Sequence, residues 1–339
     1  MRRQRVDLEA IADWGNLHRA VWKAVKGKRF RPAVLHFFED LDSSLRQLQA
    51  DILNEKVPYG GYRAFIIHDP KRRLIHAACF ADRVLHHALL NVTEPVFERS
   101  LIDTTFACRP GKGVHQAVYQ VQRNLQRFPW YVQVDVEHYF PAIDHQRMMA
   151  CLTRRFKGAA GLRLFSKILD SYHVSPGKGL PIGSLTSQHF ANLYLDAADR
   201  FLQNHPGVSA YVRYMDDMVW WCSDKTTAQQ VLRQFQSFLE TQCYLQLKPK
   251  VNLNRSVMGM TYCGFRIFPG VIRLTLRKRR RYRLLRQNYE CAWQKGRLDS
   301  LALQAAYSSV LAALLPAETR HWRQNNLQWH PCLYDNLPG

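Results

Sequence analysis

The stretch Tyr214-Met215-Asp216-Asp217 constrains the fold of this chain most, because it places two acids between two short apolar runs. These runs are Tyr211-Val212-Arg213 before the acids and Met218-Val219-Trp220-Trp221 after them. The pattern predicts a strand, a tight turn and a second strand. Adjacent carboxylates at a hairpin tip repel each other and contribute nothing to a core. They are typical of a site that holds a strong cation, and divalent metal ions are the usual occupants.

A third carboxylate stands near the end of another predicted strand. The segment from Tyr131 to Val136 is rich in β-forming residues and contains Asp135. If the two strands are antiparallel neighbours, Asp135 and Asp216 would share two metal ions about 3.5–4 Å apart. The three acids together therefore predict a two-metal site for phosphoryl transfer.

The charge of the chain favours a polyanionic partner. Lys and Arg number 48 against 27 acids, which gives a net charge of +21 and a pI near 9.9. Nucleic acid and an anionic membrane surface both fit this excess. No apolar run approaches the ~20 residues of a membrane span, and the start of the chain lacks the apolar region of a signal peptide. We therefore expect nucleic acid and no membrane.

The eight cysteines are scattered, without a C-x-x-C pair. This spacing argues against a zinc site and for reduced thiols. We therefore expect a soluble cytoplasmic protein.

Hydrophobic spacing predicts strands that alternate with long helices, followed by short strands and a basic helical tail. This order is typical of an α+β body followed by a helical module, with a boundary near 270–276. Strands are expected over 63–68, 73–76, 131–136 and within 251–275. Helices are expected over 7–55 with a break at 26–31, and over 80–92, 114–127, 145–157, 161–172, 184–203, 226–242 and from 277 onward.

Five motifs resemble those of a reverse transcriptase and follow one another along the chain in the order found in that family. The resemblance covers about Arg63 to Phe268. Val134 to Phe140 resembles the first palm motif, and Tyr214 to Asp217 resembles the catalytic hairpin. The others are Tyr262 to Ile267, similar to the primer grip, and two fingers motifs, Arg63 to Arg73 with Asp82-Arg83, and Phe106 to His115.

The resemblance implies an α+β right-hand polymerase with fingers, a palm and a C-terminal helical thumb. The palm would hold an antiparallel sheet flanked by helices. The implied divisions are an N-terminal helical segment at 1–60, fingers at 61–130 with part of 145–183, a palm at 131–275 and a basic thumb at 276–339.

The resemblance also implies the catalytic residues. Asp135 and Asp216 would be the main ligands of two Mg²⁺ ions, with Mn²⁺ as a substitute, assisted by the Val136 carbonyl. Asp217 would lie close to the ions. Phe140 would exclude a 2′-hydroxyl and so favour dNTPs over NTPs, in agreement with Met215, where RNA-dependent RNA polymerases usually have Gly.

Further residues are implied for substrate binding. Arg73, or less directly Arg72 or Lys71, would contact the triphosphate, because a guanidinium fork matches phosphate oxygens. In Leu247-Lys248-Pro249-Lys250, Lys250 is the favoured donor to pyrophosphate. Primer and template would meet Arg109, Tyr262, Gly264, Phe265, Arg277, Arg280 and Arg281. The last three stand in a tail, 270–339, that has twelve basic and four acidic residues and would grip a phosphate backbone.

One departure narrows the family. Most reverse transcriptases have Pro-Gln-Gly followed a few residues later by Ser-Pro. Here Ile182 replaces that Gln, and Gln188 replaces that Pro. This version resembles the reverse transcriptases of diversity-generating retroelements. That family implies error-prone copying at template adenines, in bacteria or phages.

The implied partners are a template RNA, the RNA/DNA hybrid, dNTPs and a basic accessory variability protein. Two other functions remain open. One is a retron, group II intron or phage-defence reverse transcriptase. The other is a catalytically silent RNA-binding protein on a polymerase fold.

Overall fold

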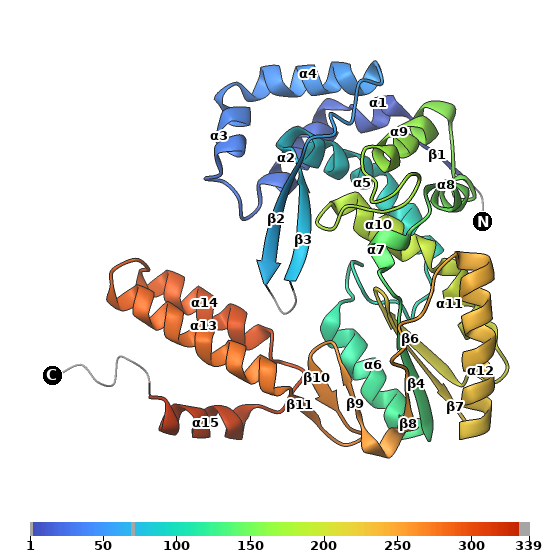
Figure 1. Cartoon of the computed structure of the whole chain (residues 1–339). Coiled ribbons are helices and arrows are strands. Elements are labelled where there is room, and N and C mark those ends of the chain that lie inside the picture. The colour runs from blue at the N-terminus through green and yellow to red at the C-terminus, as the bar shows by residue number, and fades with distance from the viewer. Residues whose placement is uncertain (1–2, 69–71, 332–339) are drawn as a thin grey trace. The chain divides into compact units, whose positions relative to one another are not determined.

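We describe the fold from a computed structural model of the chain, which describes residues 3–68 and 72–331 (Figure 1). The chain forms two compact units, each built from three separate segments. Unit 1 comprises 1–103, 135–202 and 233–249, and unit 2 comprises 104–134, 203–232 and 250–339.

Unit 1 is mostly helical. Helices α2 and α5 pack against each other, and α2 buries Leu17, Val21 and Ala24 at helical spacing. The buried amide of Asn16 donates to the carbonyls of Ile11 (2.9 Å) and Ala88 (3.0 Å), so it joins α1, α2 and α5. The helices are α1 (Leu8–Ile11), α2 (Trp14–Val25), α3 (Pro32–Glu39), α4 (Leu41–Leu53), α5 (Phe80–Ser100), α7 (Tyr139–Ala142), α8 (His145–Thr153), α9 (Ala159–Asp170), α10 (Leu185–Tyr194) and α11 (Asp196–Asn204).

An antiparallel hairpin of β2 (Tyr62–His68) and β3 (Arg72–Ala78) extends from the helices of unit 1 (Figure 1). A second, two-residue pairing is parallel and joins β1 (Gln4–Arg5) to β5 (Phe156–Lys157). The helix predicted over 145–157 would include Phe156, and this prediction was wrong. Strands of two residues carry no periodicity, and here each strand pairs with a partner 152 residues away in the sequence.

Unit 2 contains two small sheets. The first has the order β6-β7-β4-β8, and the second has the order β11-β10-β9. The first consists of β6 (Ala210–Tyr214), β7 (Asp217–Cys222), β4 (Trp130–Asp135) and β8 (Asn252–Arg255), and the second of β9 (Met260–Tyr262), β10 (Phe265–Ile267) and β11 (Ile272–Leu274).

Helices cover these sheets and share one core with them. The core joins Val121 of α6, Trp221 of β7, Phe265 of β10 and Leu314, which follows α14. The tail therefore packs on the second sheet, and the predicted boundary between palm and thumb remains a prediction. The helices of unit 2 are α6 (Val114–Arg127), α13 (Leu276–Gln294), α14 (Ser300–Ala312) and α15 (Arg320–Trp329), with a 3₁₀ helix at Ser256–Met258. Helix α12 (Lys225–Phe238) begins in unit 2 and ends in unit 1, where a π-helix follows at Leu239–Cys243.

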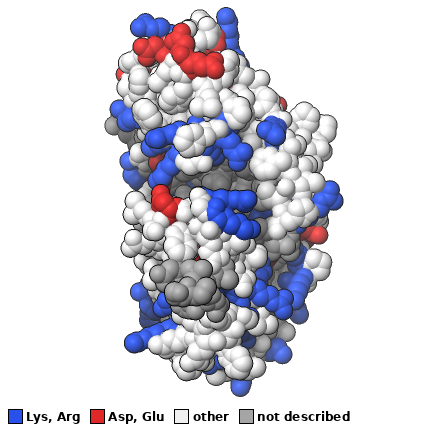
Figure 2. All heavy atoms as spheres, turned by 90° about the vertical axis from the view of Figure 1, so that its left-hand side faces the viewer, with Lys and Arg blue, Asp and Glu red and all other residues white. Residues whose placement is uncertain are grey.

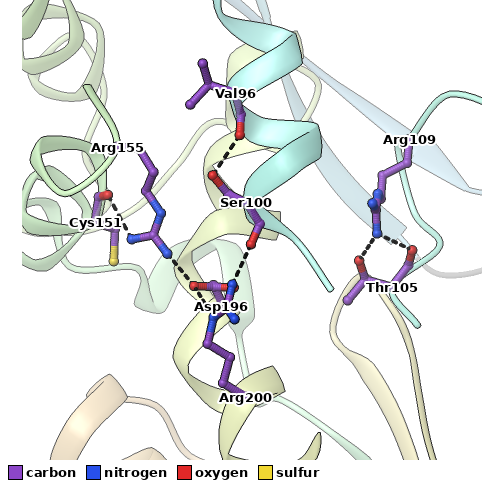
Figure 3. A network of polar contacts seen from close by, with 8 residues as sticks. All are labelled: Val96, Ser100, Thr105, Arg109, Cys151, Arg155, Asp196 and Arg200. Carbon is purple, nitrogen blue, oxygen red and sulfur yellow. Dashed lines mark hydrogen bonds and ion pairs between the residues drawn. The ribbon is translucent and has the colours of Figure 1, made fainter. Parts of the chain in front are cut away.

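A buried ion-pair network explains why the helix predicted over 184–203 is broken. The break falls at Leu195, and Asp196 begins α11 with a nearly buried carboxylate. This carboxylate pairs with Arg155 and with Arg200, the latter at 3.1 Å (Figure 3). Arg200 also donates to the Ser100 carbonyl at 2.8 Å. A buried charge needs such partners, so they fix where the second helix starts.

Of two further helix predictions, one was confirmed and the other was wrong in the number of helices. The helix over 114–127 has the bounds of α6, whereas the segment 7–55 forms four helices in place of two. Pro32 at the first turn of α3 marks one of these starts.

The close contact between α9 and Val6 gives a test of the β1–β5 region. A Cβ on Gly161 would lie 2.7 Å from Val6 Cβ and closer still to the Val6 carbonyl oxygen. Gly→Ala inside a helix normally stabilises by about 0.5–1 kcal/mol. We expect Gly161→Ala instead to lower the free energy of unfolding by about 1–3 kcal/mol, measured by urea denaturation. Gly270→Ala is the control, because nothing lies within 4 Å of its Cβ position. Equal midpoints for the two variants would contradict this packing.

Candidate active site

The acid pair lies on a two-residue hairpin turn, as the sequence predicts. Tyr214 pairs with Asp217 across β6 and β7, which leaves Met215 and Asp216 as the turn. Met215 has a φ of 56°, in the left-handed region that costs a non-glycine residue roughly 1–2 kcal/mol. The turn thus directs two carboxylates to one end of the sheet.

A fully buried arginine supports this turn. Arg213 is 0% exposed, and its Nη1 donates to the Met215 carbonyl at 3.0 Å. Its backbone nitrogen donates to the Thr104 carbonyl, and its carbonyl accepts from the Phe106 nitrogen, both at 3.0 Å. Arg213 was not among the predicted site residues, although an arginine inside an apolar run was a usable signal.

The side chain of Arg109 also makes hydrogen bonds within the protein. Its Nη1 donates to the carbonyl (3.0 Å) and the hydroxyl (2.7 Å) of Thr105 (Figure 3). The side chain is buried. We expected this guanidinium to contact primer or template, and its burial instead favours a role in holding the 104–109 segment.

Strand β4 is the sheet neighbour of β7. Gln133 on β4 donates from Nε2 to Asp217 Oδ1 at 3.0 Å. Asp135 follows two residues later and ends the strand, and residues two apart on a strand share a face. The Tyr262 hydroxyl donates to the Asp217 carbonyl at 3.2 Å. Asp135 thus ends β4 and Asp217 begins the neighbouring strand β7, while Asp216 lies in the turn between β6 and β7.

Asp135 is paired with a lysine that the sequence analysis did not favour. Lys248 Nζ lies 2.6 Å from Asp135 Oδ1, and the Lys248 backbone nitrogen donates to the Asp135 carbonyl at 2.9 Å. A bridge between Val136 and Leu247 continues this pairing. Lys250 is exposed. The register of this short segment decides which lysine faces Asp135, and spacing along the sequence does not reveal it.

The donor set fits a divalent ion in its chemistry. Carboxylate oxygens are the ligands that Mg²⁺ prefers, and Asp135 Oδ1, which is itself inaccessible to solvent, already lies against the ammonium of Lys248. Over residues 3–68 and 72–331, no group of three His, Cys, Asp or Glu side chains is close enough to hold a metal ion.

Phe140 and Ile182 are connected through one loop of unit 1. The Leu180 nitrogen donates to the Phe140 carbonyl at 2.9 Å, and the Ile182 carbonyl accepts from the His76 nitrogen at 2.8 Å. Phe140, Ile182 and Gln188 are all half-buried. This loop therefore joins the α7 segment to strand β3.

Strand alternation places Arg72 and Arg73, two of the predicted triphosphate contacts, on opposite faces of the hairpin. Partners across the hairpin share a face, so Arg73 faces the same side as Ile67, and Arg72 the opposite side with His68. Ile75 lies on the Arg73 side and contacts Gly183 of the loop. Arg73 is therefore on the face that meets the loop. Lys71 lies outside the described residues.

The predicted primer grip is a tight turn with a buried base. Gly264 has a φ of 80°, and the rings of Tyr262 and Phe265 are 1% and 0% exposed. The rings of Tyr262 and Phe265 are thus not available to a primer, whereas Cys263 and Gly264 of the turn are half-buried. Lys278 places its Nζ 3.4 Å from the centre of the Phe265 ring. Burial, and next the charge of Arg281, lower the pKa of Lys278 to about 8, although Cys263 opposes this shift.

The basic helix α13 is charged on its outer side and not all round. Arg277, Arg280 and Arg281 are exposed, as their predicted role requires. Arg286 is 2% exposed and pairs with Glu290 at 3.3 Å, so it serves the fold. On the face drawn in Figure 2, Lys and Arg side chains are more widespread than Asp and Glu.

Comparisons with known proteins agree with this arrangement. The family model for "Reverse transcriptase (RNA-dependent DNA polymerase)" matches residues 68–267, more than half of the 339 residues. The chain belongs to the reverse transcriptase family, and hence to the RNA-directed DNA polymerases.

Several curated relatives are similar to the chain over part or most of its length. Protein YkfC of Escherichia coli is 24% identical over 309 residues, which cover 76% of this chain and 79% of that protein. The group II intron-encoded protein LtrA of Lactococcus lactis is 26% identical over 139 residues, 39% of this chain. A 91 kDa protein encoded in a cob intron of Schizosaccharomyces pombe is 26% identical over 151 residues, 43% of this chain.

The matched segments make up only 23% of LtrA and 18% of the fission yeast protein. These relatives support a reverse transcriptase of the group II intron-like kind. Among helices of the described residues, none is both long and apolar enough to cross a membrane.

Proposed function

We propose that this chain extends a DNA primer on an RNA template, with Asp135, Asp216 and Asp217 as its catalytic acids. The observation that carries the proposal is the sheet order, in which the strand ending at Asp135 neighbours the strand beginning at Asp217. Membership of the reverse transcriptase family supports the same reading.

In this proposal two Mg²⁺ ions, when bound, activate the primer 3′-hydroxyl and neutralise charge on the triphosphate. Asp135 and Asp216 would hold the ions, with Asp217 and the Val136 carbonyl as further candidate ligands. Gln133 and Arg213 orient the hairpin through the contacts given above. Lys248 pairs with Asp135, and its ammonium would donate a proton to the pyrophosphate leaving group.

Substitution of Asp216 tests this proposal. Asp216→Asn keeps the shape of the side chain and removes a charge, so it loses several kcal/mol of charge stabilisation. We expect primer extension on an RNA template with dNTPs and Mg²⁺ to fall at least about 100-fold. Asp42→Asn is the control, because Asp42 is an exposed carboxylate of α4. Equal extension by wild type and Asp216→Asn would refute the catalytic assignment, and no extension by either would favour a silent RNA-binding protein.

In this proposal each unit contributes its own residues to substrate binding. Arg73 binds the triphosphate, and Phe140 packs under the sugar and selects dNTPs. The backbone at Gly264 contacts the primer, and Arg277, Arg280 and Arg281 contact phosphates of the RNA/DNA hybrid. In this proposal residues 61–130 with part of 145–183 act as fingers, 131–275 as palm and 276–339 as thumb.

The two arginines of β3 give a matched comparison. A charge-assisted hydrogen bond contributes about 1.5–3 kcal/mol, so Arg73→Ala should raise the KM for dNTP roughly 10-fold or more. Arg72→Ala removes the same charge from the opposite face, and we expect a change of about twofold or less. Steady-state kinetics with a fixed RNA template and primer measures both values. A larger effect of Arg72→Ala would mean that the other hairpin face binds the nucleotide.

We further propose error-prone copying of the kind made by diversity-generating retroelements. Ile182 and Gln188 support this, because an aliphatic side chain at 182 offers shape but no hydrogen bond to a nascent base pair. Template RNA and a basic accessory protein would be the partners, in the cytoplasm of a bacterium. The intron-encoded relatives favour the second candidate, a group II intron-like enzyme that copies its template more accurately.

Ile182→Gln distinguishes the two candidates. A restored hydrogen bond of about 1 kcal/mol should lower misincorporation roughly fivefold, mainly opposite template adenine. Sequencing of cDNA made from a defined RNA measures the error spectrum. Low error in the wild type, or an unchanged spectrum in Ile182→Gln, would favour the intron-like enzyme.

A further inference from the structure

The segment 179–184, which we call the Ile182 loop, is fixed to three different elements of unit 1. Its Leu180 nitrogen donates to the Phe140 carbonyl beside α7, at 2.9 Å. Its Ile182 carbonyl accepts from the His76 nitrogen of β3, at 2.8 Å. Ser184 at its end lies 3.3 Å, Oγ to Nδ1, from His86 of α5. The loop therefore has little freedom to move away from any one of them.

The Ile182 loop also makes a close contact with the side chain of Ile75. Gly183 has a φ of 111°, and a Cβ built on it would lie 2.7 Å from Ile75 Cγ2. The Cγ2 methyl of Ile75 therefore occupies the space beside the Gly183 backbone. Ile75 shares its strand face with Arg73, two residues earlier. One methyl group thus lies between the Ile182 loop and the face that carries the proposed triphosphate contact.

The far side of the loop gives no room for adjustment. Ser184, Thr186 and His86 are 3%, 1% and 1% exposed. The Ser184 hydroxyl lies 3.1 Å from the Thr186 hydroxyl. Burial, and to a smaller extent the charge of His87, lower the pKa of His86 to about 3, so this imidazole stays neutral. A change at Ile75 must then move β3 or the loop backbone, because closely packed interiors transmit such strain.

We propose that Ile75 is a positioning residue for nucleotide selection, because its Cγ2 methyl sets the spacing between the Ile182 loop and strand β3. This inference rests on the proposed polymerase function. Ile75 does not touch the nucleotide in this account. It acts through Gly183 on Ile182 and through the strand on Arg73.

The two γ branches of Ile75 make the idea testable with conservative changes. Ile75→Val keeps both γ carbons and loses only Cδ1. Ile75→Leu keeps the volume but has a single γ carbon, so no second methyl remains on Cβ to support Gly183. If Ile75 merely supplied apolar area, Leu would be the milder change, since Val loses a methylene. The positioning role predicts the opposite order.

The experiment is primer extension on a defined RNA by wild type, Ile75→Val and Ile75→Leu, with the KM for dNTP, kcat and misincorporation measured separately. We expect Ile75→Val to stay within about twofold of wild type. We expect Ile75→Leu to raise both the KM and the misincorporation frequency roughly 3- to 10-fold, with kcat nearly unchanged.

Ile66→Leu is the matched control, because Ile66 lies on the opposite face of the same hairpin, paired with Leu74. It reports any effect of a lower strand propensity, and it should behave like wild type. The inference is overturned if Ile75→Leu matches wild type, if Ile75→Val is the more defective variant, or if Ile66→Leu shows the same change. A wild-type chain without polymerase activity would instead refute the proposed function itself.

Discussion

The backbone pairing of β4 with β7 is the constraint on which the rest of the structure depends. It makes the strand that ends at Asp135 the neighbour of the strand that begins at Asp217. Carboxylates that come together at the end of a sheet raise the energy of the folded chain unless cations offset them. Lys248 pairs with Asp135, and the buried Arg213 donates to the Met215 carbonyl of the turn. The site is thus prepared for a stronger cation.

A second set of contacts concerns the substrate and lies within unit 1. The Ile182 loop joins the segment of Phe140 to the strand of Arg73. Sugar selection, base-pair checking and triphosphate binding would therefore depend on one another mechanically. A polymerase can lose accuracy at such a loop without losing its catalytic acids, because the chemistry and the checking use different residues.

The sequence predicted those parts of the fold and site that depend on local pattern. The hairpin at Asp216 and the helix of α6 are local, and both were found where expected. The β1–β5 pair and the helix break at Asp196 depend on distant partners, so periodicity could not show them. The same limit applies to the site. Arg213 and Lys248 owe their places to tertiary register, and Arg109 and Arg286 show that a basic side chain can serve the fold.

The central claim is that Asp135 and Asp216 bind the same metal centre. Binding of Mn²⁺, followed by electron paramagnetic resonance in wild type, Asp135→Asn and Asp216→Asn, tests it most directly and needs no polymerase activity. The account predicts that each single substitution weakens the same binding event, roughly 10-fold or more for the loss of one carboxylate ligand. Mn²⁺ binding that is lost in one variant and intact in the other would contradict it.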